Sequence, residues 1–263
     1  MRSIEGLKLT NSPLVLVLSQ IRFSEVLKMD KFAPDIQEAF KGLGLSRFTQ
    51  EESQQFIFGP KLKTKASTRW VFSDRKKTEA VILSNDFFVY QVSKYDVFDT
   101  FSERLDTLLK KLVGIVGIEF AEQVGLRYLD LIIGDDDHPV DSFISNSLQG
   151  LSASDLGVDK ANHQFVINAQ TECGTLFLRS FENSGGQFLP PDLQSPHLEF
   201  EVELKPEAEF RVLDFDHIAK GEFDFEGEML KETLWKLHKF IDMAFRVAVT
   251  PTALKIWKGE SDG

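Results

Sequence analysis

Two arginines interrupt otherwise apolar stretches of this sequence. Arg22 lies in VLVLSQIRF (15–23) and Arg127 in VGLRYLDLII (124–133), and an aromatic residue follows each of them. A guanidinium inside an apolar strand must be paired or face solvent, because an isolated buried charge is very costly. Each arginine is expected to form a structural ion pair, Arg127 with Asp130 or with a glutamate of a neighbouring strand. Alternatively, the two converge on one face of a sheet and bind an anion or an acidic partner.

A lysine-rich stretch in the first third of the chain is the second candidate binding site. Its cations are Lys61, Lys63, Lys65, Arg69, Arg75, Lys76 and Lys77. The first four alternate along an extended segment, so several of them can face one way and meet an acidic protein, RNA or DNA. Only Trp70 and Phe72 accompany them, which is too few aromatic residues to argue strongly for base stacking. Solvated loops are the simpler interpretation of the same residues.

The acidic run GDDDH (134–138) offers oxygen and nitrogen ligands for a metal ion. Asp135, Asp137 and His138 could hold Mg²⁺ or Mn²⁺, since hard cations prefer oxygen ligands. Consecutive aspartates point in divergent directions, however, and Gly134 and Pro139 mark an exposed turn. A solvated loop is therefore favoured, and we expect neither a metal ion nor another cofactor.

No segment has the spacing of a familiar catalytic motif. The patterns GxSxG, GxxxxGK[ST], GxGxxG and CxxC are absent, and the histidines show neither HxxxH nor HxH spacing. Cys173 follows Glu172, whose charge raises the pKa of a thiol, and no histidine stands near it in the sequence. A Ser/His/Asp triad stays open, because its members need not be adjacent. We name no catalytic residue and favour a protein that is not an enzyme.

Composition and charge narrow the class of protein. A single cysteine excludes an intramolecular disulfide and fits a reducing compartment. No apolar segment approaches the roughly 20 residues that span a bilayer, so we expect a cytoplasmic protein without a membrane partner. The net charge is −11, divided into +4 for residues 1–118 and −15 for residues 119–263. The acidic total disfavours nucleic acid without excluding it. The asymmetry indicates steering toward a protein partner, or of one copy toward another in a homodimer.

The elements that hold these residues follow from the apolar patterning. The first half predicts a buried strand, a short helix, four strands and a long helix. Their ranges are 14–23, 34–43, 54–58, 69–73, 80–84 and 87–92, and a helix that begins at the capping box Thr100-x-x-Glu103. The lysine-rich residues 61–69 are expected to form a connection. The long helix has an apolar stripe of Phe101, Leu105, Leu108, Leu112 and Ile115, which is the spacing of a helix packed on a sheet.

The second half repeats this order with looser spacing. It predicts a strand at 124–133, a short helix at 141–151, strands at 163–168, 175–181 and 197–204, and a long helix at 227–247. Residues 197–204, HLEFEVEL, alternate strictly, as a half-buried antiparallel strand does. The long helix carries Leu230, Leu234, Leu237, Ile241 and Ala244, which are the positions of the first stripe shifted by 129 residues. Thr250 then caps a terminal helix that ends near Trp257.

These series predict an α+β fold made of two related strand–helix–antiparallel-sheet–helix halves. Residues 1–118 form the mildly basic half and residues 119–263 the strongly acidic half, with long helices packed on curved antiparallel sheet. The order of elements resembles that of the TATA-binding-protein and helix-grip folds, a likeness that implies no function. No linker separates the halves, so they share a sheet or pack closely, and one continuous domain is the alternative.

Several phrases resemble a sporadically distributed bacterial family of about 250–270 residues that is described only as uncharacterised. They are PLVLVLSQIRFS, RWVFSDRKKT, VILSNDFF, YDVFDTFSERL, VGLRYLDLI and LHKFIDMAFRVAVTPTALKIW. The resemblance spans nearly the whole chain, and the order of the phrases is its most specific feature. It implies a bacterial cytoplasmic protein from accessory or mobile loci of the kind that carry defence and toxin–antitoxin genes. It implies no catalytic residue.

The sequence as a whole favours a non-catalytic binding or regulatory protein. Its partner would be another protein, which it binds or neutralises in a bacterial accessory system. The alternative is a helix-grip protein that binds or converts a small ligand in an apolar cavity between sheet and helix. A third hypothesis is nucleic-acid binding through the basic N-terminal half. A filled core beside an exposed apolar patch would favour the first hypothesis. An enclosed pocket holding Arg22 or Arg127 would favour the second.

Overall fold

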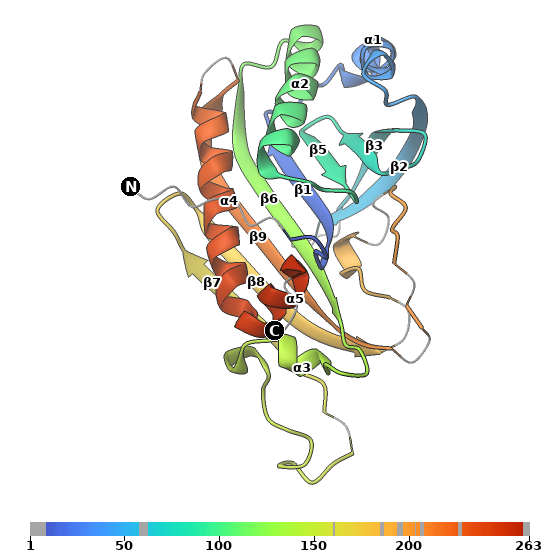
Figure 1. Cartoon of the computed structure of the whole chain (residues 1–263). Coiled ribbons are helices and arrows are strands. Elements are labelled where there is room, and N and C mark those ends of the chain that lie inside the picture. Colours follow the sequence, from blue (N-terminus) through green and yellow to red (C-terminus); the bar gives the residue numbers. More distant parts are fainter. Residues whose placement is uncertain are drawn as a thin grey trace.

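One antiparallel sheet organises the chain. The computed structural model describes residues 9–57, 63–159, 161–184, 187–193, 197–202, 204–205, 208–225 and 228–259, with the backbone alone at 53–57, 63–67 and 183–184. Within this part of the chain, nine strands form a single open sheet in the order β2-β3-β4-β5-β1-β6-β9-β8-β7 (Figure 1). The first five belong to the N-terminal half and the last four to the C-terminal half. The sheet is therefore continuous through the central pair, β1 and β6.

The strands of the sheet differ widely in length. They are β1 (Leu14–Arg22), β2 (Arg47–Ile57), β3 (Lys63–Ser73), β4 (Glu79–Leu83), β5 (Phe87–Val92), β6 (Phe120–Ile133), β7 (Gln164–Gln170), β8 (Thr175–Ser184) and β9 (Glu209–Asp224). The longest of them, β9, has no counterpart among the predicted strands. It pairs with β6 on one side and β8 on the other, so it joins the centre of the sheet to the outer strands of the second half.

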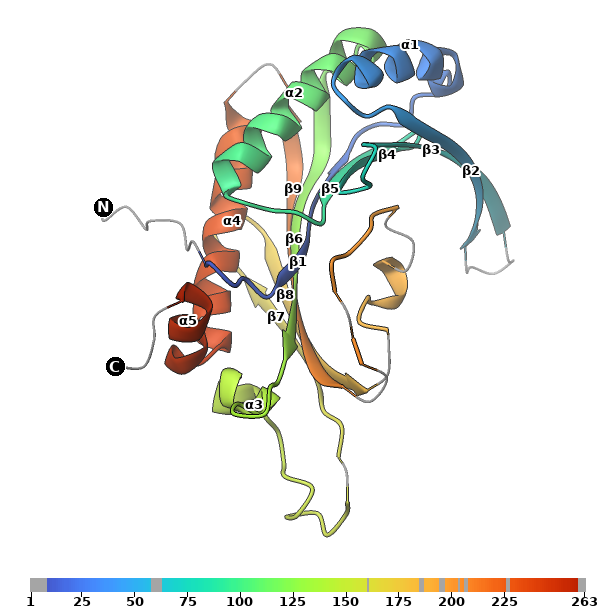
Figure 2. The same ribbon diagram turned by 45° about the vertical axis from the view of Figure 1, so that its right-hand side comes forward.

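Five helices accompany the sheet in the described part of the chain. They are α1 (Met29–Gly42), α2 (Phe98–Val116), α3 (Val140–Phe143), α4 (Met229–Ala248) and α5 (Pro251–Lys258). The two long helices, α2 and α4, lie side by side on one face of the sheet, here called the helix face (Figure 2). Thr250 caps α5 by accepting a hydrogen bond from the backbone of Ala253, as predicted. None of the described helices is long and apolar enough to cross a bilayer.

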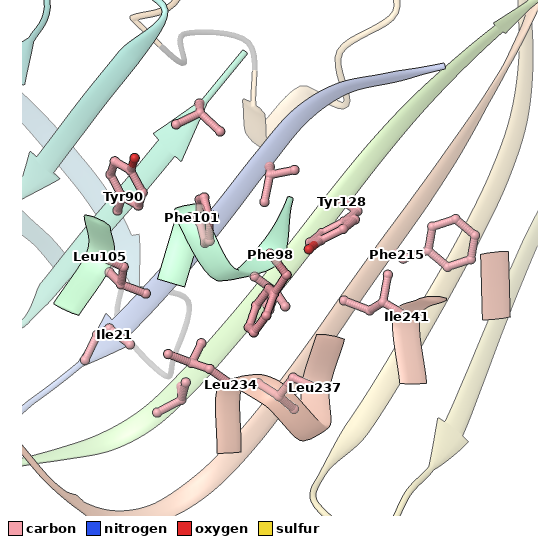
Figure 3. Close-up of a cluster of buried hydrophobic side chains, with 14 of the residues drawn as sticks. Ile21, Tyr90, Phe98, Phe101, Leu105, Tyr128, Phe215, Leu234, Leu237 and Ile241 are labelled. Atoms are coloured by element: carbon pink, nitrogen blue, oxygen red, sulfur yellow. The ribbon is translucent and has the colours of Figure 1, made fainter. Parts of the chain in front are cut away.

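The predicted stripes of the two long helices form the main core. Phe101 and Leu105 of α2 and Leu234 and Leu237 of α4 are almost fully buried, and they meet Ile21 of β1 beneath them (Figure 3). The two stripes therefore have the role that their spacing predicts. Burial of this apolar surface is what fastens both helices to one sheet.

A second apolar cluster covers the opposite face of the sheet. Leu129 and Phe210 belong to it, and the described residues of the segment 187–205, here called the cover segment, lie across it (Figure 2). Leu198 and Phe200 of this segment pack on the cluster, and the backbone N–H of Glu199 donates to the carbonyl of Lys77. The strand predicted at 197–204 is therefore wrong for its described residues. Their alternation places apolar side chains against the sheet, but these described residues form no strand of it.

Three predicted boundaries also need correction. Residues 63–69, predicted as part of a connection, belong to β3 and pair with β2 along its full length. The helix α1 begins at Met29, five residues before the predicted start at Pro34. The helix α2 begins at Phe98, and its N-cap Val97 makes no side-chain cap bond, so the capping box at Thr100 is wrong. Phe98 and Phe101 are buried in the core, and their packing fixes the start of α2 instead.

Gly174, in the turn between β7 and β8, is expected to tolerate no side chain. A Cβ there would lie 2.1 Å from the carbonyl oxygen of Ile218 in β9, and backbone cannot move aside cheaply. We expect Gly174→Ala to lower the free energy of unfolding by about 3 kcal/mol because of this overlap. Gly114→Ala is the matched control: Gly114 lies inside α2 with open space around it and should gain about 0.5–1 kcal/mol. Urea unfolding of both variants checks this, and a neutral Gly174→Ala would contradict it.

Candidate functional site

Arg22 forms a half-exposed ion pair at the end of β1. Its Nη2 donates to the Asp86 carboxylate over 2.7 Å, and the two side chains are 42% and 33% exposed. The guanidinium also lies over the Phe87 ring, 6.0 Å from its centroid. Arg22 therefore has a partner of its own.

Arg127 occupies a much more buried ion cluster on the face opposite the helices. Its guanidinium donates to both carboxylate oxygens of Asp214 in β9, over 2.7 and 2.8 Å, and to Asp192 in the cover segment. Arg179 in β8 also binds Asp214, over 3.0 Å. Burial opposes the charge of Arg127, but the bonds to Asp214 and Asp192 outweigh it and raise the pKa of Arg127. The predicted partner Asp130 is wrong, because strand alternation places it on the other face.

The two arginines share a face of the sheet but not a site. Arg127 lies opposite Leu18 of β1, whereas Arg22 lies opposite Gln123 of β6. Each guanidinium has its own carboxylate partners, and no hydrogen bond or ion pair among the described residues joins the two. Joint binding of an anion by this pair stays a prediction.

The lysine-rich cations occupy two places where the structure describes them. Arg69 lies within β3, with its guanidinium 5.8 Å from the centroid of the Phe87 ring. Arg75, Lys76 and Lys77 lie in the turn between β3 and β4, and Lys77 donates to Glu199 of the cover segment over 2.9 Å. Lys61 lies outside the described residues, as do the side chains of Lys63 and Lys65. A partner surface formed by the whole set stays a prediction.

The GDDDH run forms a compact turn after β6. One oxygen of Asp135 accepts hydrogen bonds from the backbone N–H groups of Asp137 and His138, over 2.9 and 2.7 Å, and contacts the His138 ring. The bond from the His138 backbone lowers the pKa of Asp135. In the residues that the structure describes, no group of three or more His, Cys, Asp and Glu side chains is placed to hold a metal ion. Asp135 thus has a structural use that needs no ion.

Cys173 does have a histidine nearby, although it is 44 residues away in the sequence. Its Sγ lies 3.8 Å from Nε2 of His217, which is also 2.9 Å from the Thr171 hydroxyl. Nδ1 of the same ring contacts the Leu237 carbonyl of α4 over 3.1 Å, and burial lowers the pKa of His217. A neutral imidazole held on both sides in this way ties the β7–β8 turn to α4.

The most distinctive cavity lies on the helix face, where the two halves meet. It has a volume of about 460 Å³ and opens between the start of α2, the middle of α4 and the central strand β6. Phe98, Tyr128, Asp130, His238 and Ile241 line it, and we call it the Asp130 pocket. Figure 3 shows Tyr128 on β6 with its hydroxyl directed toward Phe98 of α2. Neither Arg22 nor Arg127 takes part in it.

Asp130 is the unusual residue of this pocket. Its side chain points to the helix face, as do those of Tyr128 and Ile132, and only 4% of the residue is exposed. No residue in the described part of the chain donates a hydrogen bond to this carboxyl or forms an ion pair with it. Burial alone raises the pKa of Asp130 to about 8. At neutral pH the group is therefore a carboxylic acid, which can both donate and accept a hydrogen bond.

A hydrogen-bonded chain of two tyrosines and a histidine runs beside Asp130. The hydroxyl of Tyr95 lies 2.9 Å from that of Tyr128, which lies 3.0 Å from Nδ1 of His238. The His238 ring stacks on Phe98, with 4.2 Å between the centroids and an interplanar angle of 1°. Burial lowers the pKa of His238 to about 4, so the ring is neutral at pH 7. The pocket thus presents a few convergent polar groups beside apolar surface, which is how small-molecule sites obtain orientation and specificity.

The sequence predicts an apolar cavity between sheet and helix as an alternative, but it does not identify the residues of this pocket. It predicts Asp130 as a partner of Arg127, although their separation of three positions in a strand already directs them to opposite faces. Tyr128 and His238 are 110 residues apart, and only the packing of α4 on β6 brings them together. A lone acidic residue at an inward position of an apolar strand was the one available signal.

Comparison with known proteins adds no relative. No family model matches the chain, and no curated protein is significantly similar to it. Function is therefore inferred from the chemistry of the pocket itself.

Proposed function

We propose that this protein binds a small organic molecule in the Asp130 pocket. The observation that carries the proposal is Asp130 itself, a residue that is only 4% exposed, whose carboxyl borders the cavity and has no hydrogen-bond or ion-pair partner among the described residues. Buried polar groups in native proteins nearly always have a hydrogen-bond partner, and each exception calls for an explanation. A bound ligand supplies the missing partner.

The size and the walls of the pocket support the same proposal. A volume of about 460 Å³ lies within the range of small-molecule sites. Phe98, Ile241 and Phe245 supply apolar surface, while Asp130 and the Tyr128 hydroxyl supply the polar groups that would orient a ligand. The proposal is limited to binding.

A fragment screen with a matched pair of variants tests this proposal. Asp130→Leu makes the pocket apolar and occupies part of it, whereas Asp35→Leu makes the same change on the exposed side of α1. We expect polar fragments detected by saturation-transfer NMR on the wild type and on Asp35→Leu to lose binding on Asp130→Leu. Equal fragment binding by all three proteins would contradict the proposed site.

A protein-interaction role is our second proposal, and it is the one that the sequence favours. Trp235, Met243 and Val247 on α4 support it, since they are 51%, 46% and 73% exposed. Large apolar side chains gathered on one element often mark an interaction surface. The sequence also predicts a neutralising role in a bacterial accessory system, a homodimer and, as a third hypothesis, nucleic-acid binding. Sedimentation velocity at low and high salt tests the homodimer. If the basic and acidic halves pair, the protein should sediment as a dimer at low salt and dissociate at high salt.

We also propose that the two halves descend from one duplicated unit. The offset of the two helix stripes is 129 residues, and the sheet register supports the same number independently. Arg22 lies opposite Phe87 in β5, and Arg127 lies opposite Asp216 in β9. If Arg22 and Arg127 are equivalent, then so are Phe87 and Asp216, which are also 129 positions apart. The strand β9 and the helix α4 are thus related to β5 and α2 by the same shift of 129 residues, whereas Arg22 and Arg127 are 105 positions apart, so the equivalent units would differ in length before β5 and β9.

A further inference from the structure

Aromatic rings and carboxylates share the walls of the Asp130 pocket. The rings of Tyr95, Phe98, Tyr128, Trp235 and Phe245 border it. The carboxylates of Asp96, Asp99 and Asp242 also border it, in addition to Asp130. Aromatic faces and carboxylates both attract cations, the former through the ring quadrupole and the latter through charge. Their combination in one cavity is the arrangement that recognises an organic cation.

From this arrangement we infer that the ligand of the Asp130 pocket is an organic cation, an ammonium group on an apolar or aromatic body. The inference rests on the proposed function and specifies its ligand class. The ammonium group pairs with Asp130, the buried carboxyl without a partner among the described residues, and the apolar body lies against Phe98 and Ile241. A buried ion pair of this kind meets the requirement that a desolvated charge be compensated.

The other charged and titratable groups around Asp130 are compatible with a cation. Tyr128 comes from β6, Tyr95 and Asp96 precede α2, Asp99 begins it, and α4 supplies His238, Lys239 and Asp242. Among the described residues that line the pocket, Lys239 is the single lysine or arginine, and its Nζ lies 5.5 Å from the centroid of the Trp235 ring. Asp242 also binds Arg246 over 2.9 Å. Carboxylates therefore outnumber cations around the cavity, and an anionic ligand would meet repulsion.

Cation binding must change the protonation of Asp130. The free pocket holds an un-ionised carboxyl at pH 7, as its burial dictates. When an ammonium group enters, the O–H bond of Asp130 breaks, the proton leaves for solvent, and the resulting carboxylate pairs with the ligand. The charge of the pocket with its ligand is then unchanged from that of the empty pocket. Binding is thus expected to release close to one proton at pH 7.

Three compounds with the same body and different head groups test the inference. They are 2-phenylethylammonium, 2-phenylethanol and phenylacetate, each titrated into the full-length protein by calorimetry at pH 7. We expect the ammonium compound to bind at least tenfold more tightly than the alcohol, and phenylacetate to show no saturable binding. Titrations in two buffers of different ionisation enthalpy measure the proton released.

Asp130→Asn separates a role in cation recognition from a merely structural one. The variant keeps the shape of the side chain, so it should bind 2-phenylethanol as the wild type does, lose the tenfold preference for the ammonium compound and release no proton. Equal or tighter binding of the alcohol or of phenylacetate to the wild type would overturn the cation inference and leave the proposed function standing. Binding of none of the three, or unaltered ammonium affinity in Asp130→Asn, would also overturn it. The proposed function has its own test: it is contradicted if fragments bind Asp130→Leu as they bind the wild type.

Discussion

Asp130→Asn is expected to become progressively more stable than the wild type as pH rises from 4 to 8. The pKa of Asp130 is about 8 in the folded protein against 3.8 for an ordinary aspartate, so between these values the folded state holds a proton that the unfolded state has lost. Stability from this group is fully present below pH 3.8 and is lost as pH rises toward 8, at about 1.4 kcal/mol per pH unit. The variant lacks this loss, and the difference reaches on the order of 5 kcal/mol at pH 8.

His238 gives the opposite slope over a narrower range. Its pKa is about 4 in the folded protein against 6.5 for an ordinary histidine, so the unfolded state binds more protons between these values. Stability from His238 is therefore gained as pH rises from 4 to 6.5. In the wild type the two groups offset each other in that interval, and the fall due to Asp130 emerges between pH 6.5 and 8.

Urea unfolding at half-unit steps from pH 4 to 8 measures this prediction. The subtraction of wild type from Asp130→Asn isolates Asp130, because His238 and every other group are common to both proteins. Asp35→Asn, an exposed change on α1, should give a curve parallel to that of the wild type. Parallel curves for Asp130→Asn as well would show that this carboxyl titrates as an ordinary aspartate.

Arg127→Met is expected to cost about 3–5 kcal/mol of stability at pH 7. The change leaves Asp214, whose side chain is fully buried, without its bidentate partner, and Arg179 alone remains bound to it. A buried charge that loses its partner is strongly destabilising, although replacing the whole pair with apolar residues is often neutral. Arg127→Met combined with Asp214→Leu should therefore recover much of the loss.

Arg22→Met is the matched control for this prediction. The Arg22–Asp86 pair is 42% and 33% exposed, and exposed pairs contribute at most about 1 kcal/mol. Urea unfolding should thus show a loss of unfolding free energy that is severalfold larger for Arg127→Met than for Arg22→Met. Equal and small losses would mean that the Arg127 cluster is solvated, contrary to its burial.

Periodicity in the sequence predicted the elements that are apolar on one side. The stripes of α2 and α4 are correctly placed, because a helix that packs on a sheet must repeat apolar residues at three and four positions. The central strands β1 and β6 were also predicted, since strands buried on both faces appear as apolar runs. The α+β class follows from these elements.

Buried polar residues explain why the strand β9 and its ion pairs were not predicted. The strand β9 contains Arg211, Asp214 and His217, all fully buried, and these interrupt the apolar pattern that identifies a strand. Their partners, such as Arg127 for Asp214, lie on other elements and cannot be known before the sheet is assembled. The alternation at 197–204 had the converse effect, because a segment that lies across a sheet alternates as a strand does.

The Asp130 pocket could not be predicted for the same reason. Alternation in β6 places Tyr128 and Asp130 on one face, but His238 comes from α4, and no local spacing relates it to them. The only sign of the pocket in the sequence was the position of Asp130 in an apolar run. The same position also suggested an ion pair with Arg127. Strand alternation decides between these two uses, since it separates residues three positions apart.

A carbon-13 NMR titration of the Asp130 carboxyl tests the central claim most directly. The claim is that this group is buried without a partner among the described residues and that a ligand supplies its partner. We expect a titration midpoint near pH 8 in the free protein, and a midpoint well below 8 when 2-phenylethylammonium saturates the pocket. A midpoint near 4 that the compound leaves unchanged would contradict the claim, because it would place Asp130 in contact with solvent or a partner already present in the protein.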